Sequence, residues 1–98
     1  MTVFLVFLDR SGPGYDRSLP LEEQVGWAEH ASFMDGLVDA GFIVLGGPLD
    51  DEVRVVHAIE APSEAVVRST LGADPWSGTH LVIDSITPWT IRLDARAR

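Results

Sequence analysis

The sequence predicts an α+β fold with the element order β-α-β-β-α-β. Short runs of β-branched and aromatic residues, such as Thr2–Leu8, alternate with two segments of helical periodicity. Stretches rich in glycine and proline, such as residues 10–18, separate these elements. At 98 residues the chain has the length of one domain, so we expect a single domain over residues 1–98 with its core at about residues 2–93.

The first strand and the first helix are expected at Thr2–Leu8 and from around Ser18–Leu21 to Gly41. The strand is apolar on both alternating faces, which is typical of a central strand covered on both sides. Pro20 suits the first turn of a helix, and Gly41 is a natural stop. At roughly 100° per residue, the helix presents one apolar stripe. Its members are Trp27, His30, Ala31, Met34, Leu37 and Val38.

The remaining elements follow in the order strand, strand, helix, strand. They are expected at Phe42–Leu45, Val53–Glu60, Ser63–Leu71 and Leu81–Ile86, with a turn over residues 46–52 and Trp89–Leu93 as a further strand or a paired tail. Ser63 is the expected N-cap of the second helix, and Gly72 is its stop. This order is that of the ferredoxin-like split β-α-β arrangement. Its helices leave one sheet face open, and that face is apolar here, so we expect a homodimer that packs sheet against sheet.

The composition excludes several classes of function. Asp and Glu number 15 against 7 basic residues, all of them Arg, so the net charge of −8 argues against binding nucleic acid or an anionic membrane. The absence of Cys and Lys removes thiolate and Schiff-base chemistry. No apolar run approaches the ~20 residues of a membrane span, and the N-terminus lacks a signal-peptide pattern. A cytoplasmic location is therefore expected.

Few residues offer a site by their spacing alone. The three histidines show no metal-binding pattern, and no cofactor motif is present, so neither a metal nor a cofactor is expected. His57 is either a half-buried sheet residue or part of a pocket wall, and His80 is expected to be exposed. Arg10, Tyr15 and Arg17 follow the first strand, either as solvated loop residues or as a mouth that receives an anion.

His30 and Asp74 are the strongest candidates for chemistry. His30 lies inside an apolar helix stripe, where an imidazole must find a partner or stay neutral. Asp74 directly precedes Pro75, which restricts the backbone that carries the carboxylate. His30 is either a hydrogen-bonded core residue or, if the fold brings Asp74 beside it, the acid or base of a His–Asp dyad.

Four motifs in order resemble the YCII-like family. They are a helix histidine and a G-G-P-L turn in HASFMDGLVDAGFIVLGGPL (30–49), the D-P-aromatic loop that ends EAPSEAVVRSTLGADPW (60–76), and the closing ITPW (86–89). The resemblance covers about residues 1–93. It implies a ferredoxin-like subunit that forms a dimeric α+β barrel, with a His–Asp dyad in a pocket and small-molecule enzyme activity.

The resemblance also implies roles for individual residues. His30 and Asp74 correspond to the dyad, Gly47 and Pro48 to the pocket-lining turn, and Trp76 to the aromatic of the D-P motif. Many members carry an Arg three residues before the histidine, where this chain has Trp27. The indole implies a flatter, less charged, cyclic or aromatic ligand, although core filling explains Trp27 equally well.

Three functions remain open from the sequence. The first is a cofactor-independent isomerase, lyase or dehydrohalogenase-like enzyme, in which His30 moves a proton, Asp74 holds its tautomer and backbone amides near Gly47 steady an oxyanion. Arg10, Trp27, Pro48 and Trp76 would bind its substrate. The second is a non-catalytic module that binds a metabolite. The third is a small monooxygenase in which His30 could ligate haem.

Overall fold

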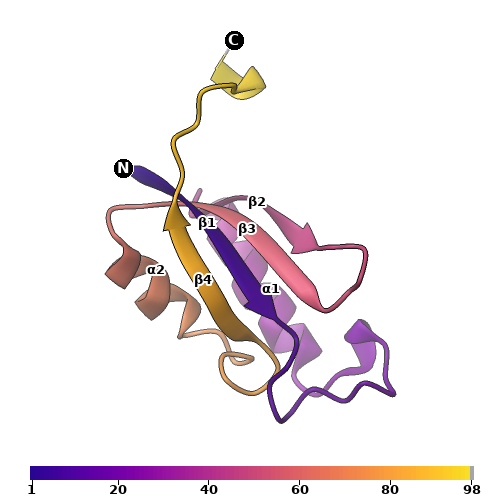
Figure 1. Ribbon diagram of the computed structural model, residues 1–98. Coiled ribbons are helices and arrows are strands. Elements are labelled where there is room, and N and C mark those ends of the chain that lie inside the picture. The colour runs from indigo at the N-terminus through magenta and orange to yellow at the C-terminus, as the bar shows by residue number, and fades with distance from the viewer. Residues whose placement is uncertain (98) are drawn as a thin grey trace.

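The computed structural model describes residues 1–97, which form a four-stranded antiparallel sheet with two α-helices on one of its faces (Figure 1). The elements are β1 (Thr2–Asp9), α1 (Trp27–Asp39), β2 (Ile43–Pro48), β3 (Arg54–Ala61), α2 (Glu64–Leu71) and β4 (Val82–Pro88), with short 3₁₀ turns η1 (Leu21–Glu23) and η2 (Ala95–Ala97). The predicted α+β class and element order are confirmed, and they are compatible with a ferredoxin-like fold.

The strands lie in the order β2-β3-β1-β4, so β1 is central as predicted. It pairs with β3 along its whole length and with β4 on its other side. Successive side chains of a strand point to opposite faces. Phe4, Val6 and Leu8 are buried, whereas the intervening residues Leu5 and Phe7 are only partly buried. One face of the sheet therefore carries the core, and the other remains open.

The core lies between the sheet and the helices. Val6, Ile59 and Val67 are 0% exposed, and they come from β1, β3 and α2 respectively. The largest core residue, Trp76 at 2% exposed, comes from the loop after α2 rather than from a helix or strand. This loop therefore contributes both to packing and to the site described below.

The first helix is shorter than the sequence predicted. It begins at Trp27, because the chain turns at Gly26, which has a left-handed φ of 80°. Gln24, only 4% exposed, binds the preceding loop through its side-chain amide: Oε1 accepts from the Asp16 N–H, and Nε2 donates to the carbonyls of Asp16 and Leu19. These bonds and the glycine break the predicted helix into η1 and α1.

The second helix and the helix ends follow the predictions more closely. Ser63 is the N-cap of α2, and its hydroxyl accepts from the Val66 N–H at 3.3 Å. Gly72 caps the other end of α2. Gly41 follows α1 in a left-handed conformation, as its role as a stop requires. No helix among residues 1–97 has the length and apolar character needed to cross a membrane.

One strand boundary was predicted wrongly, and one of the two alternatives for Trp89–Leu93, the strand, is excluded. Residues Gly46–Pro48 belong to β2 and pair with β3, so the turn begins only after Pro48. Trp89–Leu93 is not a strand: the Trp89 N–H donates to the Val3 carbonyl at 2.8 Å, and the chain then leaves the sheet (Figure 1).

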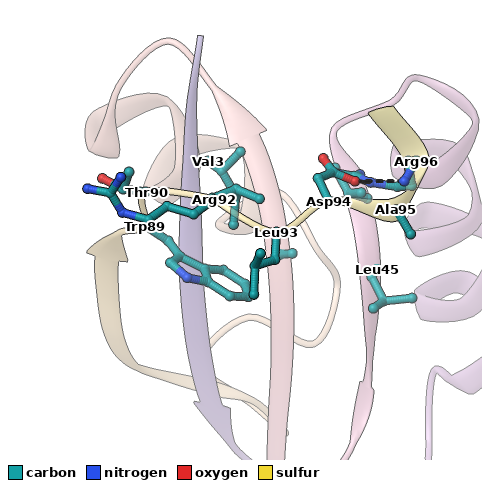
Figure 2. Close-up of a pocket in the computed structure, with 12 residues that line it drawn as sticks. Val3, Leu45, Trp89, Thr90, Arg92, Leu93, Asp94, Ala95 and Arg96 are labelled. Carbon is teal, nitrogen blue, oxygen red and sulfur yellow. Dashed lines mark hydrogen bonds and ion pairs between the residues drawn. The ribbon is translucent and has the colours of Figure 1, made fainter. Parts of the chain in front are cut away.

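A cavity of about 560 Å³ lies between this C-terminal tail and the open face of the sheet. Val3, Leu45 and Ala58 contribute its sheet side, and Trp89 and Leu93 belong to the tail. Figure 2 shows the indole of Trp89 and the side chain of Leu93 close to each other, beneath the tail. Leu93 and Leu45 are still 87% and 76% exposed, so the tail covers the apolar face only in part.

Candidate functional site

His30 and Asp74 lie in direct contact beneath the helices. Nδ1 of His30 is 2.9 Å from Oδ1 and 2.8 Å from Oδ2 of Asp74, and both residues are buried. A carboxylate only accepts hydrogen bonds, so Nδ1 carries the hydrogen and donates it. The pair that the sequence offered as one of two alternatives is therefore formed, across 44 residues of chain.

The local structure fixes each partner of this pair. His30 lies in the first turn of α1, where its backbone N–H donates to the Gly26 carbonyl at 3.0 Å. The Asp74 N–H donates to the Leu71 carbonyl at the end of α2, and Oδ1 accepts from the Trp76 N–H at 3.0 Å. The carboxylate is thereby oriented by its own loop before it meets the imidazole.

Trp76 packs directly against the imidazole of the dyad. Its indole stacks on the His30 ring with centroids 4.1 Å apart and planes 9° from parallel. The indole N–H donates to the Val25 carbonyl at 2.8 Å, which fixes the ring beneath the start of α1. A Cβ at Gly26 would lie 3.2 Å from this indole nitrogen, so close packing as well as backbone conformation favours glycine there.

His80 stacks on the opposite side of Trp76, which corrects the prediction that it is exposed. The two ring centroids are 4.5 Å apart, and His80 is only 5% exposed. Its Nδ1 contacts Oγ1 of Thr79 at 3.0 Å, whereas its buried Nε2 has no partner among the described residues. The pKa of His80 is lowered, first because burial disfavours its charged form and then because of the charge on His30.

His57 lies on β3, on the face of the sheet that carries the core, and is 6% exposed. Its ring occupies the space beside Gly46, the residue opposite it on β2, where an added Cβ would overlap Nδ1. This nitrogen is sealed and has no partner in residues 1–97. The pKa of His57 is lowered to about 4, first by burial and then by the charge that His30 carries when protonated, whereas the charge on Asp74 opposes the shift. His57 is therefore neutral at pH 7.

The second ring nitrogen of His30, Nε2, is the atom of the pair that can accept a proton. Nε2 makes no hydrogen bond within residues 1–97 and, unlike Nδ1 of His57, is not sealed from solvent. With the hydrogen on Nδ1 donated to Asp74, Nε2 presents a lone pair that can accept a proton. The resulting imidazolium would be stabilised by the Asp74 carboxylate and by the stacked face of Trp76.

A second cavity, of about 510 Å³, lies between η1, the loop after β1 and the end of β2. Arg10, Tyr15, Arg17, Leu21 and Pro48 are among the residues that line it. Arg10 is 6% exposed, and its Nη1 donates to the Glu52 carbonyl at 2.7 Å. The sequence left two alternatives for the loop after β1: solvated charged residues, or a mouth that receives an anion. In the structure, residues of this loop line a cavity.

The predicted site residues fall into two groups. His30, Asp74 and Trp76 are in contact, and the Trp27 ring lies 5.9 Å from His30 and 5.8 Å from Trp76. Arg10 and Pro48 meet instead at the cavity of about 510 Å³, which His30 and Asp74 do not line. Gly47 lies in β2 with open space where a side chain would be, so its role at an oxyanion stays a prediction.

Two features of the site were not predicted from the sequence. The overlap of Gly46 with the His57 ring depends on strand register, which no local pattern revealed. The stack of His80 on Trp76 had a weak signal, because the two residues lie four apart in one tight loop. Within residues 1–97, no group of three or more His, Asp or Glu side chains is placed to hold a metal ion.

Comparisons with known proteins add no further guide to this site. Neither a protein-family model, nor a curated protein, nor a solved structure matches the chain. The geometry and chemistry of the residues described above are therefore the only guide to function.

Proposed function

We propose that the protein is a cofactor-independent enzyme that transfers a proton to or from a small molecule through the His30–Asp74 dyad. The observation that carries this proposal is the contact of His30 Nδ1 with both carboxylate oxygens of Asp74, at 2.9 and 2.8 Å, while Nε2 has no hydrogen-bond partner within residues 1–97. Isomerisation and elimination, as in a lyase or a dehydrohalogenase, both begin with such a transfer.

Each neighbour has a defined part in this mechanism. Nε2 of His30 takes the proton from carbon or oxygen of the substrate, and Asp74 holds the imidazole in the required tautomer. The stacked indole of Trp76 fixes the ring plane and favours the imidazolium that forms. A proton returned from Nε2 to another atom of the substrate completes an isomerisation, whereas loss of a leaving group completes an elimination.

We also propose that the chain is a YCII-like protein and that two copies pack sheet against sheet as a dimeric α+β barrel. Support comes from the four motifs of the sequence and from the compatible strand order. The open face supports the dimer, because Val3, Leu5 and Phe7 on β1 are only partly buried there. An apolar face of this kind gains stability when a partner covers it.

Deuterium exchange tests the proton transfer even while the substrate is unidentified. The protein is incubated in D₂O with a panel of small ketones, lactones and 2-oxo acids, and loss of the α-proton signal is followed by ¹H NMR. We expect faster exchange of at least one compound with the wild-type chain. His30→Gln should slow that exchange by roughly 10²-fold or more, which is the usual contribution of a general base.

Two further variants separate catalysis from folding. Asp74→Asn keeps the shape of the side chain but removes its charge, so exchange should slow while circular dichroism stays unchanged. Glu29→Gln alters an exposed acid beside His30 on α1 and should leave the exchange rate unchanged. If His30→Gln retained the wild-type rate, or no compound in the panel exchanged faster with protein, the proposal would be wrong.

A further inference from the structure

We propose that the cavity at Arg10 is a binding site for the carboxylate group of a small molecule. This inference goes beyond the proposed function, because it concerns residues other than the His30–Asp74 dyad and holds whatever chemistry that dyad performs. Three observations carry it: a buried arginine without an acidic partner, further donors around the same cavity, and the cavity volume of about 510 Å³.

Arg10 is a buried cation without a counter-ion. It is 6% exposed, and no carboxylate in residues 1–97 lies within 4.0 Å of its guanidinium. Such a charge is costly to bury unless something pairs with it. The lack of a partner is notable because the chain has 15 acidic residues. Arg54, Arg68 and Arg96, which are far more exposed, all form ion pairs.

The guanidinium also keeps donors for a ligand. Nη1 donates to the Glu52 carbonyl at 2.7 Å, but Nε and Nη2 have no partner among the described residues and are not sealed from solvent. Two adjacent N–H groups in one plane fit a carboxylate, which accepts two parallel hydrogen bonds. The side chain therefore presents an unused fork at the wall of the cavity.

Other residues of the cavity fit the same ligand class. Arg17 lines it, and no carboxylate in residues 1–97 lies within ion-pair distance of its guanidinium. Tyr15 adds a hydroxyl that makes no hydrogen bond among the described residues. Glu22 and Glu52 also line the cavity, but neither forms an ion pair with an arginine of residues 1–97. The volume is that of a site for a small molecule.

A series of packed aromatic rings lies between the cavity and the dyad. Tyr15 meets the His80 ring edge to face, His80 stacks on Trp76, and Trp76 stacks on His30. The cavity and the dyad thus lie at opposite ends of a continuous series of packed rings.

Ligand titrations on the full chain test the site directly. Benzoate is the carboxylate probe, benzamide is its neutral isostere, and inorganic phosphate is the competing anion. In ¹H–¹⁵N spectra, benzoate should shift the Arg10 Nε–H signal in a saturable manner, and benzamide should not. Arg68, exposed on α2 and outside both cavities, provides the internal control, and its signal should not saturate.

Variants distinguish a ligand site from a structural role. Arg10→Met keeps a side chain of similar length, and it should weaken benzoate binding at least tenfold and abolish the rise in melting temperature that benzoate causes in the wild type. Without benzoate, its melting temperature should equal or exceed that of the wild type. If Arg10→Met melted at a lower temperature than the wild type, and benzoate had no effect on the wild type, Arg10 would have only the structural role of holding the loop at Glu52, and the proposal would be wrong. Should Arg10→Met not fold, the wild-type Arg10 signal still decides.

The remaining outcomes are also decisive. Equal binding of benzoate and benzamide would overturn the charge argument, and tighter binding of phosphate than of benzoate would overturn the assignment to carboxylates. Benzoate binding should survive in His30→Gln. If it does while proton exchange is lost, the two sites are separate; if exchange fails in the wild type but benzoate binds at Arg10, only the proposed enzyme function is wrong.

Discussion

Tryptophan side chains on the two faces of the sheet differ in burial and in hydrogen bonding. On the covered face, Trp76 is 2% exposed, donates its indole N–H to Val25 and stacks between His30 and His80. On the open face, Trp89 is 46% exposed and borders a cavity beside a tail that leaves the sheet. The sequence alone gives both residues the same appearance, an indole directly after a proline.

This difference shows where the fold places polar chemistry. The covered face combines a large apolar core with imidazoles and a carboxylate, and it orients them through hydrogen bonds and ring stacks. The open face is apolar along β1, and the ion pair of Arg96 with Asp94 beside its cavity comes from the C-terminal tail rather than from the sheet. A site that needs fixed geometry therefore belongs to the first face, and a surface for association belongs to the second.

Removing the covered indole should have the largest effect. Trp76→Ala deletes a buried ring and its hydrogen bond, so we expect the free energy of unfolding to fall by about 3–5 kcal/mol. Trp89→Ala, the matched change on the open face, should cost less than about 1 kcal/mol. Urea unfolding of both variants measures the contrast, and equal losses would contradict the difference between the faces.

The buried His57 should make the stability of the covered face depend on pH. Its pKa is about 4 in the folded state against the ordinary value of 6.5, so the unfolded chain binds more protons between these values. Its contribution is complete above about pH 6.5 and is lost as the pH falls towards 4. The total loss is roughly 3 kcal/mol at 1.36 kcal/mol per pKa unit.

His57→Leu isolates this contribution, since leucine cannot bind a proton and leaves no unpartnered nitrogen. Urea unfolding at several pH values between 7 and 4 should show a shallower decline in stability for the variant than for the wild type. At pH 7 the variant should be about as stable or more stable, because the sealed Nδ1 of His57 is absent. Parallel pH curves for the two chains would contradict the buried, neutral state of His57.

Gly46 offers a smaller and more local test of the same packing. A Cβ at this position overlaps the His57 ring, so Gly46→Ala must displace the ring or the strand, at a cost of about 1–3 kcal/mol. Gly47→Ala is the neighbouring control, because nothing lies within 4 Å of the added carbon; it should leave the free energy of unfolding within about 0.5 kcal/mol. The double change Gly46→Ala with His57→Ala should recover part of the loss from Gly46→Ala alone, measured against His57→Ala.

The fold was predictable from the sequence where local signals were strong. The apolar run Thr2–Leu8 identified the central strand, because it is apolar on both faces, and Ser63 and Gly41 correctly marked the start of α2 and the end of α1. The start of α1 was not predictable in this way. Pro20, which suits a first helical turn, placed the start of the helix near Ser18–Leu21. The hydrogen bonds of Gln24 to a loop five to eight residues earlier are tertiary contacts that no helical pattern contains.

The candidate site was predictable in part for the same reason. His30 was recognisable because an ionisable residue interrupts an apolar stripe, and Asp74 because proline follows it. Their contact depends on how α1 packs against the loop after α2, which spacing within the sequence does not fix. His80 was wrongly predicted to be exposed because its burial comes from stacking on Trp76. The one local sign of this partner is weak: His80 follows Trp76 by four residues in the same tight loop.

The open face allows the last and smallest prediction. Leu45 is 76% exposed and lines the cavity of about 560 Å³, so in a single chain Leu45→Ser should change the free energy of unfolding by no more than about 0.5 kcal/mol. A dimer that covers this face would alter that result, because the side chain would then be buried against the partner. The loss would exceed about 1 kcal/mol and would grow with protein concentration, since association stabilises the folded chain by mass action. Thermal unfolding of the wild type and Leu45→Ser at a low and a high concentration measures this difference. A small loss that is independent of concentration would argue against the proposed packing of sheet against sheet at Leu45.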